Sequence, residues 1–518
     1  MEESMSTTPA KRTHTAVSAA ILLMISAFVS GLLGLVRIRY INHLFPPGIE
    51  QDAYIAAFKW PDLLAYFLVG SAASVSMITM LNRYRDAGDE EGADRALSVV
   101  LTTMLAVLIA ATIVFALAAP LYVYIALGKE FYHDARGPLC ISLTRWLLPA
   151  QLFFFIGSML SARLQVRKIF IYQALTPVIY NGGILLGAYL FHRKVGVYSP
   201  VIGVLAGVIV GSFLLNSLGA LRTGFRFSPR IGFKDEAFLE WLQAALPLMI
   251  GVSLVMFDGL FFNRFAADNK GDLSLINIAK NLFNAPFSVI GPSVGAASLP
   301  FFASLFQRKQ MWEFSTTVGR SVSRLFAVGM LIAAWMIPLG PWLMDLLRGG
   351  LSADQAARTT LLLRIFCLTL PLWAVQGLYA RAFYATSDTR TPAIAGTTIV
   401  VLSFPFYWLF YRLLGINGLA VASDLGILLQ TATLAILLHR KRLASIAHLD
   451  NLELGRALLA AVLSGLAASY LTHLLPSPAG YKTDFLTLTG ASIGWAVVAL
   501  AVLFAMGSSL PKQLLRRK

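Results

Sequence analysis

Long hydrophobic segments separated by short polar loops recur along almost the whole chain. A helix needs about 20 mostly apolar residues to cross the hydrocarbon core of a bilayer. Fourteen segments of the 518-residue sequence are long enough: 16–45, 52–81, 96–127, 137–162, 169–191, 196–221, 238–265, 273–306, 316–347, 357–385, 391–411, 416–438, 456–475 and 485–508. The pattern therefore predicts an all-α polytopic membrane protein with fourteen transmembrane helices.

Composition agrees with this prediction. The chain is 57% hydrophobic and only 13% charged, whereas soluble domains contain about 25% charged residues.

Basic residues are distributed unevenly between the loops. With successive loops assigned to opposite sides, one side holds 24 Lys and Arg and the other holds 9. Cytoplasmic loops carry the excess of basic residues, so both termini are predicted to be cytoplasmic, with residues 1–15 as a short tail.

The two halves of the sequence resemble each other. The segment SAASVSMITMLNRY (71–84) is similar to GAASLPFFASLFQRK (295–309), and each precedes a basic loop. The segments 161–177 and 379–392 each join a fourth to a fifth helix. This repeat predicts two six-helix lobes related by a pseudo-two-fold axis along the membrane normal, followed by two extra helices. The corresponding domains are 1–221 for the N-terminal lobe, 222–237 for a linker, 238–442 for the C-terminal lobe and 443–518 for the appended pair.

The linker between the lobes carries four large apolar residues among basic ones: Phe225, Phe227, Ile231 and Phe233. This mixture is typical of an amphipathic segment at a membrane interface. A fully solvated linker is the alternative interpretation.

The sequence contains none of the motifs that commonly mark an enzyme. It has no GxSxG, no HExxH, no nucleotide-binding loop and no Cys/His cluster. We therefore predict a transporter with no catalytic residue, no metal site, no cofactor and no nucleic-acid partner. A Na⁺ or H⁺ gradient, the membrane potential or substrate supply would then drive it.

Basic residues inside the predicted spans are candidates for substrate binding, because a charge at bilayer depth is costly unless it is paired, snorkels or faces water. Ser30, Gly34 and Arg37 share one helical face, and Lys59 and Lys280 each precede a proline in their helix. Cations from both halves suit an anionic substrate, and a diphosphate is the natural candidate. The structural alternatives are that Arg37 and Arg39 snorkel to the interface and that Lys59 pairs with Asp52 or Asp62.

Two carboxylates lie in apolar helices of the second half, at Asp258 and Asp424. A buried carboxylate is neutralised, paired with a cation such as Arg264, or used to hold an ion. Ion coupling by Asp258 and Asp424 is one of these three possibilities.

Three stretches resemble the MurJ/MviN lipid II flippases of the multidrug/oligosaccharidyl-lipid/polysaccharide exporter superfamily. They are SGLLGLVRIRYINHLFPPGIEQDAYIAAFKWPDLL (30–64), NAPFSVIGPSVGAASLP (284–300) and FYATSDTRTP (383–392). Arg37 and Asp52 match an arginine and an aspartate of the family pattern. Three positions that carry arginine in the family are Gly31, Ala65 and Asn281 here.

The resemblance implies a flippase in the bacterial cytoplasmic (inner) membrane. Its substrate would be lipid II, the undecaprenyl-diphosphate-linked peptidoglycan precursor, moved from the inner to the outer leaflet by alternating access. The site residues it implies are Arg37, Asp52, Lys59, Lys280 and Asn281. The alternatives are a flippase for another lipid-linked oligosaccharide, a multidrug exporter, which the cationic residues disfavour, and a non-transporting scaffold. The sequence is silent on oligomeric state.

Overall fold

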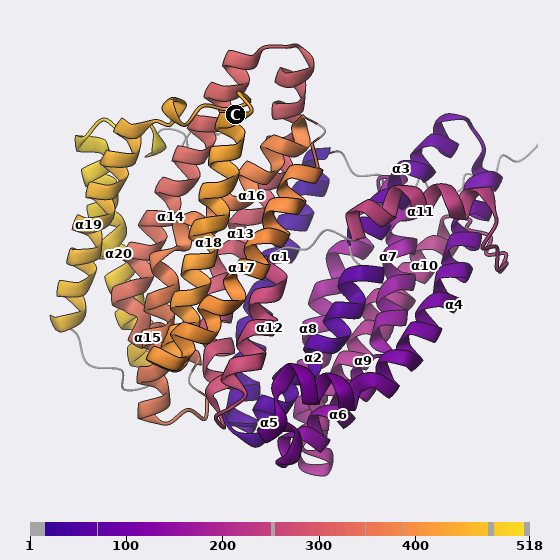
Figure 1. Cartoon of the computed structure of the whole chain (residues 1–518), viewed down its shortest axis with the longest axis horizontal. Helices are drawn as coiled ribbons and strands as arrows, with labels where there is room; N and C mark the ends of the chain where they lie inside the picture. The colour runs from indigo at the N-terminus through magenta and orange to yellow at the C-terminus, as the bar shows by residue number, and fades with distance from the viewer. Residues whose placement is uncertain are drawn as a thin grey trace, which may run out of the picture. The chain divides into compact units, whose positions relative to one another are not determined.

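A computed structural model of the chain describes residues 16–69, 71–249, 254–347, 349–386, 388–474 and 481–511 (Figure 1). The predicted cytoplasmic tail, residues 1–15, lies outside them. Throughout the described ranges the regular structure is helical, without a strand. This confirms the all-α class and agrees with the apolar composition, because a helix satisfies every backbone hydrogen bond within its own segment.

Ten helices in the described ranges are long and apolar enough to cross a membrane, and there are eleven if a pair bent by 45° counts as one span. That pair is α15 (Ala353–Leu368) and α16 (Leu370–Ala385), and it corresponds to the predicted span 357–385. The predicted spans 52–81, 238–265 and 273–306 are not among the ten. The first is divided by the π-helical turn at residues 65–69, and the second includes residues 250–253, which lie outside the described ranges.

The elements follow one another along the chain with short connections. In order they are α1 (Ala16–Leu44), α2 (Ile49–Leu64), the π-helical turn η1 (Ala65–Val69), α3 (Ser71–Asp86), α4 (Glu90–Tyr122), η2 (Val123–Leu127), α5 (Lys129–His133), α6 (Arg136–Leu147), α7 (Ala150–Val166), α8 (Ile171–Val195), α9 (Tyr198–Val208), η3 (Ile209–Leu214), α10 (Leu215–Arg222), α11 (Glu236–Met249), α12 (Leu254–Ala266), α13 (Asp272–Gln307), α14 (Met311–Leu347), α15 (Ala353–Leu368), α16 (Leu370–Ala385), α17 (Arg390–Leu414), α18 (Ile416–Arg440), η4 (Ile446–His448), α19 (Asn451–Leu474) and α20 (Tyr481–Ala505).

The chain forms two compact units. Unit 1 comprises Met1–Arg37, Ala57–Pro120 and Ile141–Ile250, and unit 2 comprises Ile38–Ala56, Leu121–Cys140 and Gly251–Lys518. Two short segments from the N-terminal part of the sequence, 38–56 and 121–140, therefore belong to the unit that holds the C-terminal helices.

Unit 1 is held together by a buried apolar cluster and by close helix packing. The cluster draws on α3, α4, α7 and α11, and Trp241 in α11 donates its indole N–H to the Ala73 carbonyl at 3.1 Å. Between α8 and α9 the contact is made by glycines. A Cβ added at Gly183 would lie 2.7 Å from the Cα of Gly207, so the backbones can approach this closely only without side chains.

The segment that follows α10 is fastened to α4 by its backbone. The N–H groups of Arg226, Ser228 and Gly232 donate to the side chains of Asp94 at 3.1 Å, Ser98 at 3.2 Å and Thr103 at 2.9 Å. Of the four apolar residues of the predicted linker 222–237, only the first is buried. The other three, Phe227, Ile231 and Phe233, remain exposed, which leaves this segment with one packed face and one apolar outer face.

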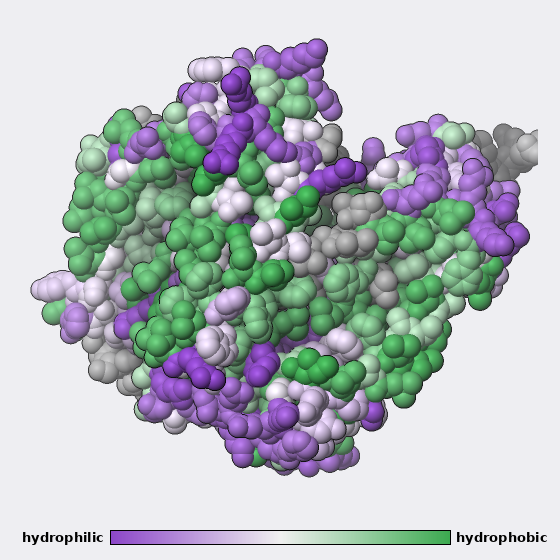
Figure 2. All heavy atoms as spheres, in the orientation of Figure 1, coloured by the Kyte–Doolittle hydropathy of each residue, from purple (hydrophilic) through white to green (hydrophobic). Residues whose placement is uncertain are grey.

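Unit 2 is a bundle in which α13, α14, α16 and α18 lie side by side, and α19 and α20 cover α14 at one edge (Figure 1). Its outer helices expose large apolar residues: Val401 of α17 is 67% exposed and Leu466 of α19 is 62% exposed. Figure 2 shows mainly hydrophobic residues along the middle of these helices and hydrophilic residues at their ends. This distribution is expected for helices that face lipid.

Each unit contains a helix in which a proline frees a carbonyl group and an arginine binds it. Proline has no N–H, so the carbonyl four residues earlier loses its helical partner. In α4 the freed carbonyl is Ala116, before Pro120, and Arg145 of α6 donates Nε–H to it at 3.0 Å. In unit 2, before Pro341 of α14, Arg364 of α15 donates to the Ile337 carbonyl at 3.0 Å. In each unit an arginine thus satisfies a carbonyl that a proline leaves free.

Candidate functional site

Lys280 occupies a cage of aromatic rings inside unit 2. Its side chain, which α13 places in the bundle, is only 14% exposed. The Nζ atom lies 4.1 Å from the ring centroid of Trp373 and 4.4 Å from that of Phe366, with Phe283 at 5.0 Å and Phe262 at 5.6 Å. Aromatic faces attract a cation, most strongly where water is excluded. The cage therefore stabilises a buried ammonium group.

The cage also contains the carboxylate that neutralises this lysine. Asp258 of α12, which is 2% exposed, lies 3.0 Å from Lys280 Nζ. Tyr407 of α17 donates its hydroxyl to one Asp258 oxygen, and Ser423 of α18 donates to the other at 3.1 Å. Lys280 in turn donates to the Ser423 hydroxyl at 3.2 Å. Four helices thus meet at a single ion pair with satisfied hydrogen bonds, as a buried pair requires.

Two residues with predicted roles thus come together, because Lys280 was predicted to bind substrate and Asp258 to couple an ion. In this structure each neutralises the other. The pairing of Asp258 with Arg264, one of the alternatives considered from the sequence, is not what the structure shows. Arg264 lies 3.6 Å from Asp268 on the next turn of its own helix.

Two other predicted site residues belong to unit 2. Asn281 follows Lys280 in the sequence, and Asp424 interacts with Lys280 electrostatically. Asp424 of α18 is buried and accepts a hydrogen bond from the Thr369 hydroxyl. Its negative charge acts on Lys280 across the bundle. Asn281 is exposed and donates to the side chain of Asn277 at 2.8 Å on the preceding turn of α13. Asp258, Lys280 and Asp424 therefore belong to one electrostatic cluster, with Asn281 beside it on α13.

Arg37 and Lys59 lie in unit 1, in a second cluster of ionisable groups. Arg37 makes no hydrogen bond or ion pair with the residues that the structure describes, and it interacts electrostatically with Tyr180 of α8. The same tyrosine is influenced by Asp62, whose main charged neighbour is Lys59 three residues earlier on α2. Arg37 and Lys59 are half-buried and Asp62 is exposed. Of the two partners considered for Lys59, the structure thus favours Asp62.

Asp52 is fully buried in unit 2 and all its acceptor positions are used. It accepts N–H groups from Gly271 at 2.6 Å and from Ser274 at 3.0 Å, and also the Ser274 hydroxyl. Arg136 lies 3.4 Å away. These donors are at the start of α13, where a carboxylate satisfies free N–H groups and complements the helix dipole. The observed contacts of Asp52 are therefore those of a helix cap.

Arg39 has a similar structural role at the other end of a helix. Its guanidinium donates to the carbonyl of Leu346 in the last turn of α14, and Asn42 donates to the Leu347 carbonyl at 3.2 Å. Cations and donors at a helix C-terminus satisfy the free carbonyls. Arg37 and Arg39, two residues apart, thus have different environments: Arg39 binds helix-end carbonyls, whereas Arg37 makes no hydrogen bond or ion pair with the described residues.

In the signature FYATSDTRTP (383–392), Ser387 lies outside the described residues, and Asp388 begins the turn that starts α17. Asp388 accepts from the Thr391 N–H at 3.0 Å and from its hydroxyl at 2.7 Å, and Lys441 lies 2.6 Å away. Partial burial acts to raise the pKa of Asp388, but the hydrogen bonds from Lys441 and Thr391 outweigh it and lower the pKa to about 2. The motif is thus explained by helix capping and an ion pair.

Sequence reasoning missed Tyr407, Ser423 and the aromatic cage. Tyr407 lies in an apolar run, FPFYWLFY, and nothing in it indicates a buried partner. Ser423 precedes Asp424 in an otherwise apolar helix, and this polar pair was a usable signal. The aromatic residues come from four helices, α12, α13, α15 and α16, and are apolar in pattern, so only the packing of the helices shows that they surround a charge.

The fold and the buried charges define the class, a multi-pass membrane protein that holds ionisable groups within each helical unit. The family model described as lipid II flippase MurJ matches residues 41–489, most of the chain. This chain therefore belongs to the lipid II flippase MurJ family, which confirms the resemblance of the three sequence stretches.

Individual relatives are distant in sequence. The probable lipid II flippase MurJ of Borreliella burgdorferi is 21% identical over 416 residues, which cover 80% of this chain and 81% of that protein. A solved structure titled "Lipid II flippase MurJ, inward closed conformation" has a TM-score of 0.74 at 20% identity and covers 96% of this chain and 100% of its own. A solved structure of a multidrug resistance MATE family transporter in an inward-facing conformation has a TM-score of 0.63 at 16% identity. The match covers 83% of this chain and 99% of that chain. At sequence identities of 20% and 16%, these two solved structures show that the fold is shared and no more.

Proposed function

We propose that this protein is a lipid II flippase. It moves the undecaprenyl-diphosphate-linked peptidoglycan precursor from the inner to the outer leaflet of the bacterial cytoplasmic membrane by alternating access. The observation that carries this proposal is the family match over residues 41–489. The largely buried Lys280 and the half-buried Arg37 support it, because phosphate oxygens are bound well by ammonium and guanidinium groups.

The proposed architecture has fourteen spans. Two six-helix lobes, 1–221 and 238–442, are related by a pseudo-two-fold axis and joined by the linker 222–237, and the pair of helices in 443–518 follows. The repeated proline sites support this symmetry. Pro120 and Pro341 are 221 residues apart in sequence and each frees a carbonyl that an arginine binds. Both termini are cytoplasmic in this arrangement, as the distribution of basic loops favours.

In the proposed site Arg37, Lys59, Lys280 and Asn281 contribute contacts to the diphosphate. Asp52 contributes by capping α13, the helix that carries Lys280 and Asn281. The sugar and peptide of the substrate remain in water while the prenyl chain stays in lipid, since burying either in the other medium is costly.

Lys280 can bind a diphosphate only if it leaves Asp258, because the two are paired at 3.0 Å. Once the diphosphate takes the lysine, Asp258 is left as a buried, uncompensated charge, which costs several kcal/mol. A proton or Na⁺ that joins Asp258, with Asp424 nearby, removes that cost. Ion coupling through Asp258 and Asp424 thus follows physically from substrate binding at Lys280.

The function is tested by complementation. Cells depleted of their own lipid II flippase are expected to grow when they express this protein, and to stop growing with Arg37→Glu at an equal protein level. The matched control is Arg193→Glu, an exposed arginine at the end of α8 in the same unit. Full rescue by Arg37→Glu would remove Arg37 from the site. Transport that is insensitive to both Na⁺ and H⁺ gradients would remove ion coupling.

A flippase for another lipid-linked oligosaccharide is the second candidate. It is favoured by Gly31, Ala65 and Asn281, which stand where the family pattern has arginines. The head group of the lipid that co-purifies with the protein distinguishes the two, and failure to rescue flippase-depleted cells with a normal protein level would favour the second.

A further inference from the structure

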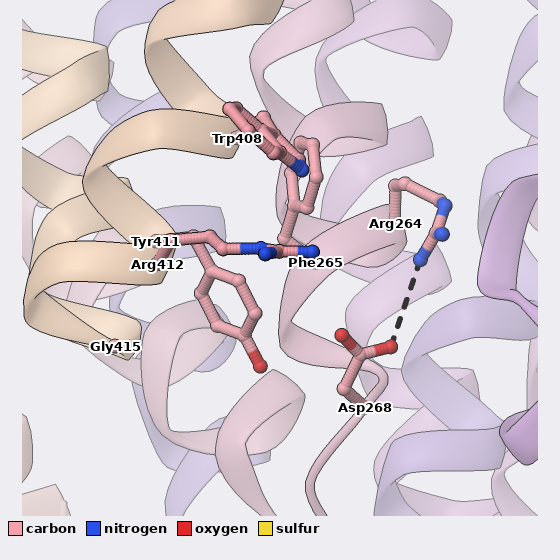
Figure 3. Close-up of a pocket in the computed structure, with 7 residues that line it drawn as sticks. All are labelled: Arg264, Phe265, Asp268, Trp408, Tyr411, Arg412 and Gly415. Atoms are coloured by element: carbon pink, nitrogen blue, oxygen red, sulfur yellow. Dashed lines mark ion pairs between the residues drawn. The ribbon is translucent and has the colours of Figure 1, made fainter.

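A pocket of about 430 Å³ opens at the C-terminal ends of α12 and α17, and none of the residues of the Lys280 cage lines it (Figure 3). Arg264 and Asp268 line one side, and Trp408, Tyr411 and Arg412 line the other. The lining thus carries two guanidinium groups and one carboxylate. All of these residues belong to unit 2, and no role has been derived for them above.

Arg412 is the residue that makes this pocket suited to an anion. Its guanidinium carbon lies 4.9 Å from the ring centroid of Trp408, and in the described part of the chain it forms no ion pair. Figure 3 shows its side chain extending across the pocket toward the side where Arg264 lies. Arg264 shares its charge with Asp268, but only at 3.6 Å and with both side chains 40% exposed. Among the residues that line the pocket, two guanidinium groups thus face one carboxylate, while Glu130 and Asp272 act on the lining from outside it.

The outer face of α17 leads from this pocket along an apolar stripe. Ile394, Val401 and Trp408 are spaced seven residues apart, so they lie on one helical face, and they are 66%, 67% and 48% exposed. The stripe covers roughly 21 Å of helix at 1.5 Å per residue. Trp, Tyr and Arg at the end of such a stripe are typical of the level of lipid head groups.

We propose that this pocket binds the phosphate of an anionic lipid, with the hydrocarbon chain lying along the Ile394–Val401–Trp408 stripe. Arg412 and Arg264 donate charge-assisted hydrogen bonds to the phosphate oxygens, and basic pockets between membrane helices bind acidic head groups in this way. Two kinds of lipid offer this chemistry, an acidic phospholipid and a polyprenyl diphosphate. The proposal is independent of flippase activity, because it requires only binding.

The test is native mass spectrometry of the full chain in detergent, titrated separately with phosphatidylglycerol, phosphatidylcholine and undecaprenyl diphosphate. The expected result is that R264Q/R412Q loses one anionic lipid per protein, with affinity reduced roughly tenfold or more, since hydrogen bonds to charged groups contribute about 1.5–3 kcal/mol. Loss of the phosphatidylglycerol adduct assigns the site to a phospholipid, and loss of the diphosphate adduct assigns it to the carrier lipid. Loss of both adducts shows that the site recognises the phosphate group that the two lipids share.

Two variants keep this test decisive. R193Q removes an exposed helix-end arginine from unit 1 and should bind all three lipids as the wild type does. R264K/R412K keeps both charges and should retain most of the binding if the variant folds. Wild-type adducts in R264Q/R412Q, or equal binding of phosphatidylglycerol and phosphatidylcholine by the wild type, would overturn the proposal. A lower unfolding temperature in R264Q/R412Q with unchanged adducts would assign the arginines to helix capping instead.

Discussion

Replacing Lys280 by methionine is expected to destabilise the protein strongly. Methionine fills a similar volume and packs well against aromatic rings, so the main loss is the positive charge. The variant leaves Asp258, which is 2% exposed, without the cation that lies 3.0 Å away. Only the hydroxyls of Tyr407 and Ser423 would then remain to stabilise its carboxylate.

The expected loss can be estimated from the geometry. Two unit charges 3.0 Å apart attract each other by roughly 5 kcal/mol at an effective dielectric constant of about 20. Removal of one partner from a buried ion pair costs about 3–5 kcal/mol, because the other charge stays desolvated. We therefore expect K280M to lower the free energy of unfolding by about 3–5 kcal/mol.

The double variant K280M/D258N separates the structural role from the substrate role. It removes both charges, and replacement of a whole buried pair by neutral groups is often nearly neutral for stability. K280M/D258N should therefore recover most of the stability that K280M loses. If Lys280 also binds the diphosphate, the double variant should still fail to complement flippase-depleted cells. The exposed control K441M, outside this cluster, should complement normally.

The assay is thermal and denaturant unfolding of the purified protein in detergent, with complementation measured in parallel at matched protein levels. Unchanged unfolding of K280M would contradict the idea that the pair is buried and strong. Restored stability together with restored growth in K280M/D258N would show that the lysine has only a structural function.

Three further predictions concern other parts of the fold. The variant R364A should lower the free energy of unfolding by about 1–3 kcal/mol by leaving the Ile337 carbonyl of the membrane helix α14 unsatisfied, and the added change P341A should restore most of it because the new N–H binds that carbonyl; equal unfolding of both variants would contradict this. D52A should cost about 3–5 kcal/mol in denaturant unfolding, because it removes a helix cap and leaves the buried N–H groups of Gly271 and Ser274 unsatisfied, although Arg136 keeps its pair with Asp134, and wild-type stability would refute the assigned role. The pKa of Asp388 is lowered to about 2 from about 3.9 in the unfolded chain, so its stabilising contribution is present above about pH 4 and is lost as the pH falls toward 2. The unfolding temperature of the wild type should therefore approach that of D388N between pH 5 and pH 2.5, and K441M should weaken this dependence; a constant difference would contradict it.

Much of this protein follows from local sequence. Long apolar runs can only be helices in a bilayer, because every backbone group must be satisfied within the segment. A charge at that depth is costly, so the sequence predicted that five charged residues are paired or bind a substrate or ion: Arg37, Lys59, Lys280, Asp258 and Asp424. The motifs at 30–64, 284–300 and 383–392 indicated the family, since they depend on particular residues and not on periodicity.

Tertiary structure alone decided which charge meets which. Asp258 had a nearer cation in sequence, Arg264, yet it pairs with Lys280 of the next helix. Asp52 had Lys59 seven residues away, yet it caps α13. In a soluble protein the buried face of a helix is marked by its apolar residues. In a membrane helix the lipid-facing side is apolar as well, so the sequence pattern shows that a polar group must find a partner but not which helix supplies it.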